Sequence, residues 1–273
     1  MPMPFLAPGD LENAGLSSTA ISISNPLVQE ESLLRTSLMP GQLKIISYNQ
    51  SHRIKKLKFF EIGHVYLPSE DNQLLPDERE YLSISIAGGD ATEIVAILDM
   101  ISLTMAFPNM QLKQHEIEGL HPGRSAQVFV AGQERGAVGE VDPRVLRNYG
   151  IDDSVAWLEL DLGSILAGPF GKKKYTSVSK YPSSDIDLAF EVPDDTSSAS
   201  VAGCLRKAGG TYLKEVQLFD SYKADTANER VRSLAYSLRF QSDEGTLTDA
   251  EVSELRAACI SEVEQKTNAK LRE

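Results

Sequence analysis

The sequence predicts an α+β protein organised as two domains. A chain of 273 residues is long enough for two domains of ordinary size, each with its own core. Helical and strand patterns alternate irregularly over the first part, whereas a shorter and more regular pattern follows. A stretch rich in proline, glycine and lysine, residues 167–182, separates the two. We therefore place one domain at residues 1–170, a linker at 171–180 and a second domain at 181–273.

The first domain mixes strands and helices. Runs of aromatic and β-branched residues predict strands, and apolar residues at helical spacing predict helices. The expected strands are residues 57–67, 79–89 and 155–162, with a hairpin around Gly132 within 127–141. The expected helices are two short pieces within 32–49 that meet at Pro40-Gly41, a longer one within 91–107 stopped by Pro108, and a short one within 142–150 that has Asp142 as its N-cap.

The second domain has a simpler pattern. Residues 187–192, 212–220 and 233–240 predict three strands. A helix over 198–208 separates the first two strands, and a helix that opens with the capping box Thr248-Asp-Ala-Glu251 follows the third. Residues 269–272 close the chain. The order strand, helix, strand, strand, helix, strand is that of a ferredoxin-like βαββαβ fold.

One face of this predicted sheet has room for a ligand. In the third strand Leu234, Tyr236, Leu238 and Phe240 share the face that packs under the helices, and Ser233, Ala235, Ser237 and Arg239 share the other. A small, polar face that ends in a cation suits a splayed single-stranded base. The alternative is an ordinary hydrated sheet face. Tyr222 follows the second strand, where the alternation no longer decides which face it takes.

Composition excludes several classes of function. The net charge of −12 argues against a general nucleic-acid or DNA binder, with residues 51–58 and 171–174 as local basic exceptions or simply solvated segments. No apolar run approaches the roughly 20 residues of a membrane helix. With Cys204 and Cys259 as the only cysteines, we expect no disulfide framework and a reducing cytoplasm. The four histidines are scattered, and no phosphate-binding loop or nucleophile motif is present, so we expect no catalytic residue and no metal site.

Specific motifs identify a family. The segments YPSSDIDLAFEV, LFDSYK and RSLAYSLRFQSDEGTLTDAEV closely resemble the ferredoxin-fold anticodon-binding domain that ends the β subunit of bacterial phenylalanyl-tRNA synthetase. The segments NPLVQEESLLRTSLMPG, LKFFEIGHVY and GLHPGRSAQVFVAGQERGAVGEVDPRVLRNYG resemble the catalytic-like module that precedes it. The resemblance implies that the first domain is an incomplete class II synthetase-like antiparallel-sheet module. Since the family's subunit is much longer, we expect a C-terminal fragment, a truncated gene product or a split subunit.

The resemblance implies a role without catalysis. The family's α subunit binds ATP, magnesium and phenylalanine, so no cofactor is expected on this chain, and the α subunit is its expected partner. Phe59-Phe60-Glu61 stands where the class II second motif would have an arginine beside an acid, and Glu134-Arg135 lies in the predicted hairpin instead of a third-motif helix. For SLLRTSLMPG the resemblance implies a subunit interface, and the alternative is an ordinary helical core segment.

For RNA, the resemblance implies that the first anticodon base of phenylalanine tRNA docks on the second domain. Its stacking aromatic falls on Tyr222, its acid on Asp220 and a hydroxyl contact on Ser233, and Arg239 is the cation on the same predicted face. Where the family usually has an arginine, this chain has Ile186, which we expect to remove either a fixed cation near the RNA face or a partner for Asp187. The alternative function is a non-catalytic protein-interaction scaffold, or a truncated remnant that does not bind tRNA.

Overall fold

The computed structural model describes residues 4–69, 75–168, 175, 178–194, 196–223 and 231–272. The chain folds into two compact units, residues 1–174 (unit 1) and residues 175–273 (unit 2). Each unit has its own hydrophobic core. Most of the linker expected at 171–180 lies outside the described residues.

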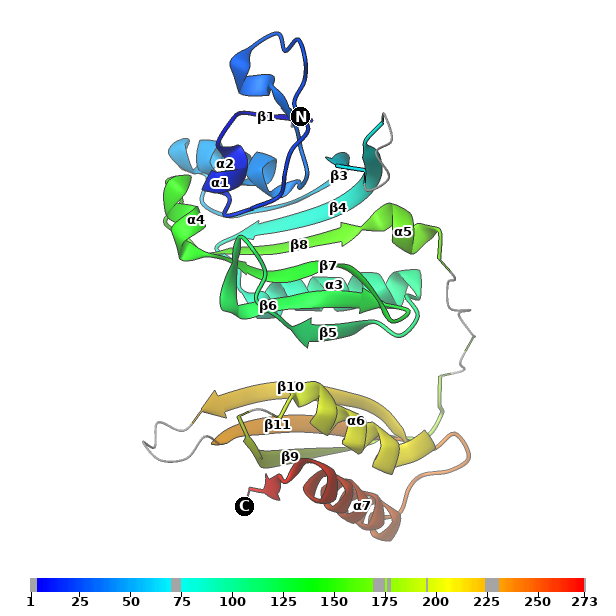
Figure 1. Cartoon of the computed structure of the whole chain (residues 1–273). Helices are drawn as coiled ribbons and strands as arrows, with labels where there is room; N and C mark the ends of the chain where they lie inside the picture. The colour runs from blue at the N-terminus through cyan, green and yellow to red at the C-terminus, as the bar shows by residue number, and fades with distance from the viewer. Residues whose placement is uncertain are drawn as a thin grey trace. The chain divides into compact units, whose positions relative to one another are not determined.

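Unit 1 is built on a six-stranded antiparallel sheet with the strand order β3-β4-β8-β7-β6-β5 (Figure 1). The strands are β3 (Leu57–Leu67), β4 (Asp77–Ala87), β5 (Gln111–Gln114), β6 (Leu120–Val130), β7 (Gln133–Val141) and β8 (Val155–Asp161). The helices are α1 (Asp10–Asn13), α2 (Met39–Ser51), α3 (Ala91–Met105), α4 (Pro143–Asn148) and α5 (Leu162–Leu166). A two-stranded pair, β1 (Phe5–Leu6) with β2 (Leu33–Leu34), and a 3₁₀ turn (Gln29–Glu31) precede α2.

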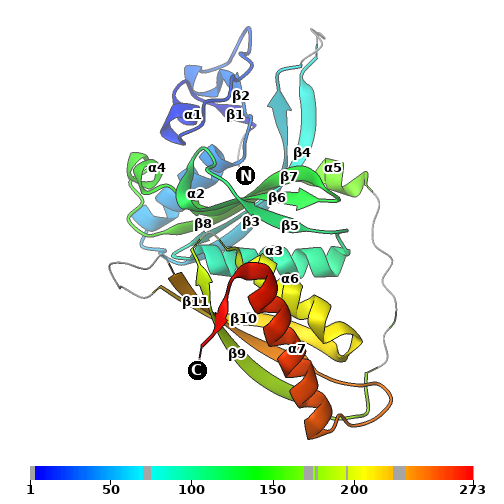
Figure 2. The same cartoon turned by 60° about the horizontal axis from the view of Figure 1, so that its bottom comes forward.

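The central strand β8 separates two cores. Val155 and Trp157 pack into one core with the buried side of α2, whereas Ala156 and Leu158 pack into the other with α3. Successive side chains of a strand point to opposite faces, so α2 and α3 cover opposite faces of the sheet (Figure 2). Every residue of β8 is buried, which accounts for its almost continuous apolar sequence.

The expectation of two helices meeting at Pro40-Gly41 is wrong. A single helix, α2, begins at Met39 and carries Pro40 in its first turn, where a missing backbone N–H costs nothing. Residues 35–40 are all buried within unit 1. The interface implied for SLLRTSLMPG is therefore not available at these positions, and the alternative of a core segment describes them.

Other local predictions are confirmed. The β6–β7 hairpin turns at Gly132, which has a φ of 78°. Asp142 caps α4 by accepting a hydrogen bond from the backbone N–H of Arg144, and Gly150 follows the helix with a φ of 65°. These elements form where expected because their caps and turns are encoded within a few residues.

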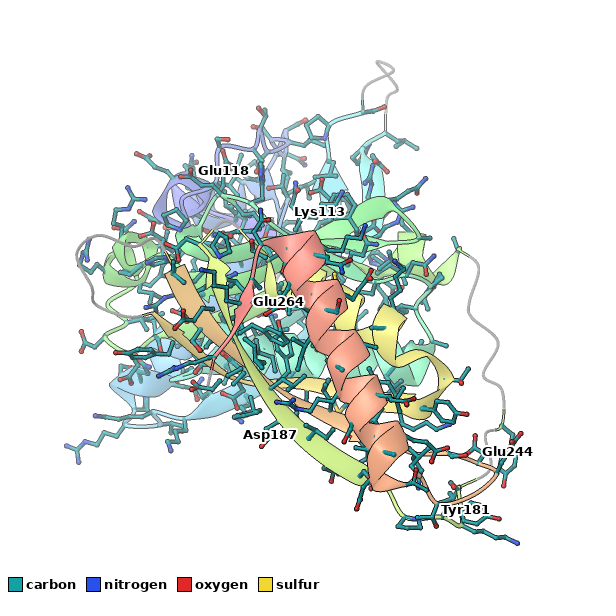
Figure 3. The ribbon with its side chains drawn as sticks, turned by 90° about the horizontal axis from the view of Figure 1, so that it is seen from below. Lys113, Glu118, Tyr181, Asp187, Glu244 and Glu264 are labelled. Atoms are coloured by element: carbon teal, nitrogen blue, oxygen red, sulfur yellow. The ribbon has the colours of Figure 1, made fainter. Side chains whose placement is uncertain are left out.

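Unit 2 has the predicted βαββαβ order. Its elements are β9 (Ser184–Pro193), α6 (Ser198–Gly209), a 3₁₀ turn (Gly210–Tyr212), β10 (Leu213–Lys223), β11 (Val231–Phe240), α7 (Asp249–Thr267) and β12 (Lys270–Leu271). The sheet order is β10-β11-β9-β12. Alternate residues of β9 and β11 form one core with Val201 and Leu205 of α6 and Cys259 and Val263 of α7. Both helices therefore cover the same face, and Figure 3 views the unit from the side on which α7 lies.

Candidate nucleic-acid interface

Among the described residues of unit 2, both helices, α6 and α7, pack on one face of the sheet, and no helix covers the other face. We call it the open face. The middle of this face is made of small residues, because Ala235 of β11 pairs with Ala189 of β9, and Ser237 lies two residues further along β11. The residues of β9 and β11 that point to the helices, among them Leu188, Phe190 and Tyr236, are almost fully buried. The short side chains in the middle of the open face thus leave room for a flat ligand.

A bulge in β10 decides which side chains of this strand reach the open face. Leu218 pairs with Tyr236, but Asp220 pairs with Ala235, so Phe219 is an extra residue in the ladder. Unbroken alternation would place Asp220 and Tyr222 on the helix side. The one-residue shift turns both of them to the open face instead.

The bulge brings three predicted residues together. Tyr222 lies directly across from Ser233, and Asp220 lies across from Ala235, two positions along β11. Paired residues on adjacent antiparallel strands have Cβ atoms about 4.5–5.5 Å apart on the same face. The Tyr222 side chain is 56% exposed, so its ring is available for stacking. Ring, carboxylate and hydroxyl therefore occupy neighbouring positions on the open face.

Sequence reasoning missed a cation beside this group. The backbone N–H of Arg272, next to β12, donates to the carbonyl of Ala189, and its Nη1 donates to Ser233 Oγ at 3.5 Å. Lys270 pairs with Glu191 on the same face. The alternation of Lys270, Leu271 and Arg272 was the available signal, because a leucine that packs against the core between two exposed cations turns both cations to the other face.

Arg239 is not brought to this group. It stands six residues along β11 from Ser233, which is about 20 Å in a strand. Its guanidinium donates to Asp185 (2.8 Å from Nε) and to Glu215 (3.3 Å from Nη1). The hydrogen bonds between Arg239 and Asp185 are the main reason that the pKa of Arg239 is raised. The same bonds lower the pKa of the Asp185 carboxyl. Arg239 is thus an ion-paired surface residue at the far end of the open face.

The expectation for position 186 is also corrected. Ile186 pairs with Leu238 and packs against the core on the helix side of the sheet. An arginine there would extend from the helix side, so its replacement by isoleucine removes no cation from the open face. Isoleucine is favoured at this position because it adds apolar area to the core.

The charges of the open face favour a base over a phosphate. Asp185, Asp187, Glu191 and Asp220 are exposed carboxylates of β9 and β10. They repel a phosphate backbone, but a carboxylate accepts hydrogen bonds from the N–H groups at a base edge. A neutral base stacked on Tyr222 is therefore the nucleic-acid moiety that fits the Asp220 side, and Lys270 of β12 and the adjoining Arg272 lie at the other side.

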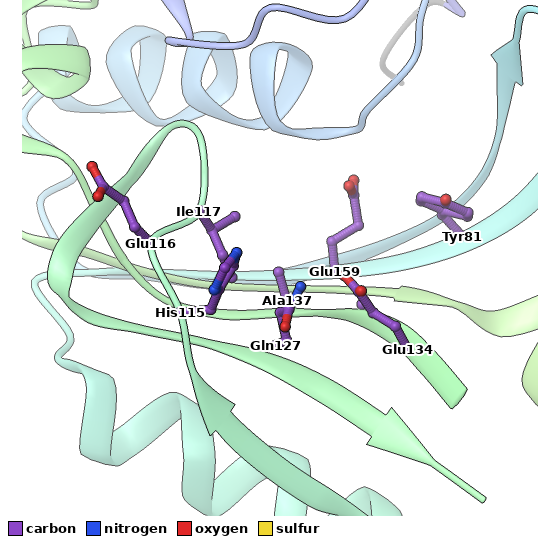
Figure 4. A pocket seen from close by; sticks show the side chains of 9 residues that line it. Tyr81, His115, Glu116, Ile117, Gln127, Glu134, Ala137 and Glu159 are labelled. Carbon is purple, nitrogen blue, oxygen red and sulfur yellow. The ribbon is translucent and has the colours of Figure 1, made fainter. Parts of the chain in front are cut away.

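Unit 1 contains a cavity of about 300 Å³ on the α2 face of its sheet (Figure 4). It is lined by Tyr81, His115, Glu116, Ile117, Gln127, Glu134, Gly136, Ala137 and Glu159. Three carboxylates and no lysine or arginine are among these described residues. Carboxylates repel the phosphates of a nucleoside triphosphate, so the side chains of this lining do not favour ATP.

Glu159 lies in the wall of this cavity and has a structural role there. Its Oε1 accepts from the backbone N–H of Leu38 at 2.7 Å, and Ser37 Oγ lies 3.1–3.2 Å from both carboxylate oxygens. Burial raises the pKa of Glu159 to about 7, against these hydrogen bonds and the charge of Arg35, which lower it. The carboxyl pins the start of α2 to β8.

The described residues of both units hold no cluster of three or more histidine, cysteine, aspartate or glutamate side chains suited to a metal ion. None of their helices has the length and apolar character that crossing a membrane requires.

Comparisons with known proteins agree with this architecture. Residues 1–162 match the family model described as "Phenylalanyl tRNA synthetase beta chain CLM domain", and residues 179–272 match "Ferredoxin-fold anticodon binding domain". Curated relatives named phenylalanine--tRNA ligase beta subunit include those of Clostridium tetani (34% identity, 92% of this chain, 32% of the relative), Clostridium acetobutylicum (29%, 92% and 32%) and Symbiobacterium thermophilum (30%, 85% and 27%). The chain spans about a third of the length of these relatives.

Proposed function

Because this chain belongs to the family of phenylalanyl-tRNA synthetase β chains, we propose that it binds the anticodon of phenylalanine tRNA through the open face of unit 2. In this role it serves ATP-dependent aminoacylation in the cytoplasm, as a part of the ligase that performs no chemistry itself. The proposed domain organisation is a catalytic-like module at residues 1–170, a linker at 171–180 and an anticodon-binding domain at 181–273.

The observation that carries the RNA part of this proposal is the bulge at Phe219. It turns Tyr222 and Asp220 to the open face, across from Ser233 and Ala235. A stacked base contributes roughly 1–3 kcal/mol of binding free energy per ring. Asp220 accepts hydrogen bonds from the base edge, which favours a base such as guanine that presents N–H groups there. Arg272, next to Ser233, supplies a cation for the adjoining phosphate.

Unit 1 is proposed to support a catalytic α subunit. Its cavity has the wrong charge for a nucleoside triphosphate, which supports placing ATP and magnesium outside this chain. Apolar side chains available for a subunit contact are exposed on β3 and α3, where Phe60 is 69%, Met100 60% and Leu103 79% exposed. If these side chains form one contiguous patch in the assembled ligase, they would be suited to a protein contact, because contiguous exposed apolar patches mark such surfaces.

The proposal is tested by tRNA binding to Tyr222→Ala, with Tyr222→Phe as the matched control. Loss of the ring weakens binding of a phenylalanine tRNA transcript about 5- to 150-fold, the equivalent of 1–3 kcal/mol. Tyr222→Phe keeps the ring and retains most of the affinity. Since the side chain is more than half exposed, both variants fold like the parent. Equal affinity of Tyr222→Ala and the parent would reject the stacking role and leave a protein scaffold as the function.

A further inference from the structure

The connection between α2 and β3 is a strongly basic exposed segment of the described chain. It reads His-Arg-Ile-Lys-Lys over residues 52–56, and all five residues are exposed. The segment contrasts with the net charge of −12 of the whole chain. We call residues 52–56 the basic loop.

Three cations of the basic loop are unpaired within the described part of the chain. Arg53, Lys55 and Lys56 make no ion pair there, whereas the flanking lysines do: Lys44 contacts Asp10 at 2.6 Å, and Lys58 contacts Glu93. Acidic proteins have carboxylates available to neutralise a surface cation. Cations that stay unpaired in such a chain are free to contact an anionic partner.

Aromatic rings lie beside these cations. The rings of Tyr48 and His52, one turn apart at the end of α2, have centroids 4.3 Å apart and an interplanar angle of 37°. The Tyr48 side chain is 66% exposed, and the neighbouring Ile54 is 47% exposed. Positive charge that tracks a phosphate backbone, combined with rings on which bases stack, is the surface that nucleic-acid binders present.

The backbone of the basic loop is held in place where it leaves α2. The N–H groups of His52 and Ile54 donate to the carbonyl of Asn49, both at 3.0 Å, and the N–H of Arg53 donates to that of Gln50 at 2.9 Å. Arg53 has a φ of 67°, a left-handed conformation in which glycine is the unstrained residue. The cations are thus presented from a fixed turn, and Arg53→Gly removes a charge while it relaxes the backbone.

We propose that the basic loop, with Tyr48 and His52, is a second RNA contact of this chain that holds the sugar-phosphate backbone of a structured RNA without reading its sequence. It goes beyond the proposed function, which concerns the open face of unit 2, and adds a contact on unit 1. RNA is favoured over an anionic membrane because three free cations fall short of the four to eight that typify lipid-binding clusters, while the rings suit unpaired bases.

The test compares the intact chain with the triple variant Arg53→Gly/Lys55→Gln/Lys56→Gln. Affinity for a full-length phenylalanine tRNA transcript is measured by filter binding over a series of salt concentrations. Each phosphate contact contributes about 1 to the slope of log affinity against log salt, so the triple variant loses roughly 2 to 3 from the slope. Lys113→Gln is the matched control, since Lys113 is an exposed cation of β5, at the sheet edge opposite β3. An unchanged slope in the triple variant overturns the proposal.

A second RNA separates this contact from the open face. If the basic loop holds RNA outside the anticodon arm, the triple variant binds an isolated anticodon stem-loop as the parent does, whereas Tyr222→Ala weakens binding of both RNAs. If the proposed function is wrong, Tyr222→Ala binds RNA as tightly as the parent. If the present proposal is wrong, the triple variant keeps the affinity and the salt dependence of the parent. Loss of binding to phosphatidylserine vesicles with unchanged tRNA binding would instead identify a membrane contact and overturn it.

Two single variants serve as controls for effects on folding. Arg53→Gly raises the thermal midpoint of unit 1 because it relaxes a left-handed residue, and it still weakens tRNA binding because the guanidinium is gone. Ala106→Gly relaxes the equivalent position after α3, where φ is 54°, without a change in charge. It raises the midpoint and leaves tRNA binding unchanged. Equal tRNA affinities of Arg53→Gly and Ala106→Gly would contradict the role of the Arg53 charge.

Discussion

Glu159→Gln is expected to remove a pH dependence from the stability of unit 1. Glu159 is 8% exposed, and the pKa of its carboxyl is raised from 4.5 to about 7, mainly by burial. Between these values the folded unit keeps the proton and the unfolded chain releases it. The folded state therefore binds more protons, so its stability falls as pH rises through this window. At about 1.4 kcal/mol per pH unit between 4.5 and about 7, this corresponds to roughly 3 kcal/mol of stability lost between pH 4.5 and pH 8.

Urea unfolding at a series of pH values measures this loss. The chain has one tryptophan, Trp157, which is buried in unit 1 two residues before Glu159, so its fluorescence reports the unfolding of this unit alone. Glutamine keeps an oxygen for the N–H of Leu38 but cannot ionise, so the stability of Glu159→Gln stays flat over this window. Carboxyls with lowered pKa, such as Asp142, titrate below the window. Parallel stability curves for parent and variant would refute the assignment of the raised pKa to Glu159.

Two substitutions test unit 2. Tyr236→Phe removes a buried hydroxyl that donates to the carbonyl of Ser198 at 2.8 Å. We expect the stability of the unit, measured by calorimetry, to fall by about 1 kcal/mol. An unchanged thermal midpoint would show that this bond contributes nothing. Thr248→Ala removes the capping box, in which Thr248 Oγ1 accepts from the N–H of Glu251 and the Glu251 carboxylate accepts from the N–H of Thr248. It lowers stability by about 1 kcal/mol, whereas Thr248→Ser, which keeps the hydroxyl, lowers it less; equal losses would contradict the capping role.

Local signals in the sequence are sufficient for most of unit 2. The period of two in Leu188, Phe190 and Val192 predicts which side of β9 is buried, because one face of the sheet must meet the helices. The capping box marks the start of α7, because its hydrogen bonds link residues three apart. In these elements the information lies within a few positions, so it can be read without the fold.

The bulge in β10 and the start of α2 depend on contacts between residues far apart in the sequence. Leu218 and Phe219 are two consecutive apolar residues that interrupt the alternation of β10, but only the pairing with β11 shows that the interruption is a bulge. Pro40-Gly41 is typical of a helix break. It lies in the first turn of α2 because the N–H of Leu38 is bound by Glu159, which is 121 residues away in the sequence. Such long-range contacts are decided by the tertiary structure.

The central claim, that Tyr222 stacks on the first anticodon base, is tested most directly by a double-mutant cycle. Binding free energies are measured for the parent and Tyr222→Ala, each with an intact phenylalanine tRNA and with one that lacks the base at the first anticodon position. If ring and base contact each other, removing either one weakens binding by about 1–3 kcal/mol, and removing both weakens it little further. Fully additive losses would contradict the contact and with it the assignment of the open face to the anticodon.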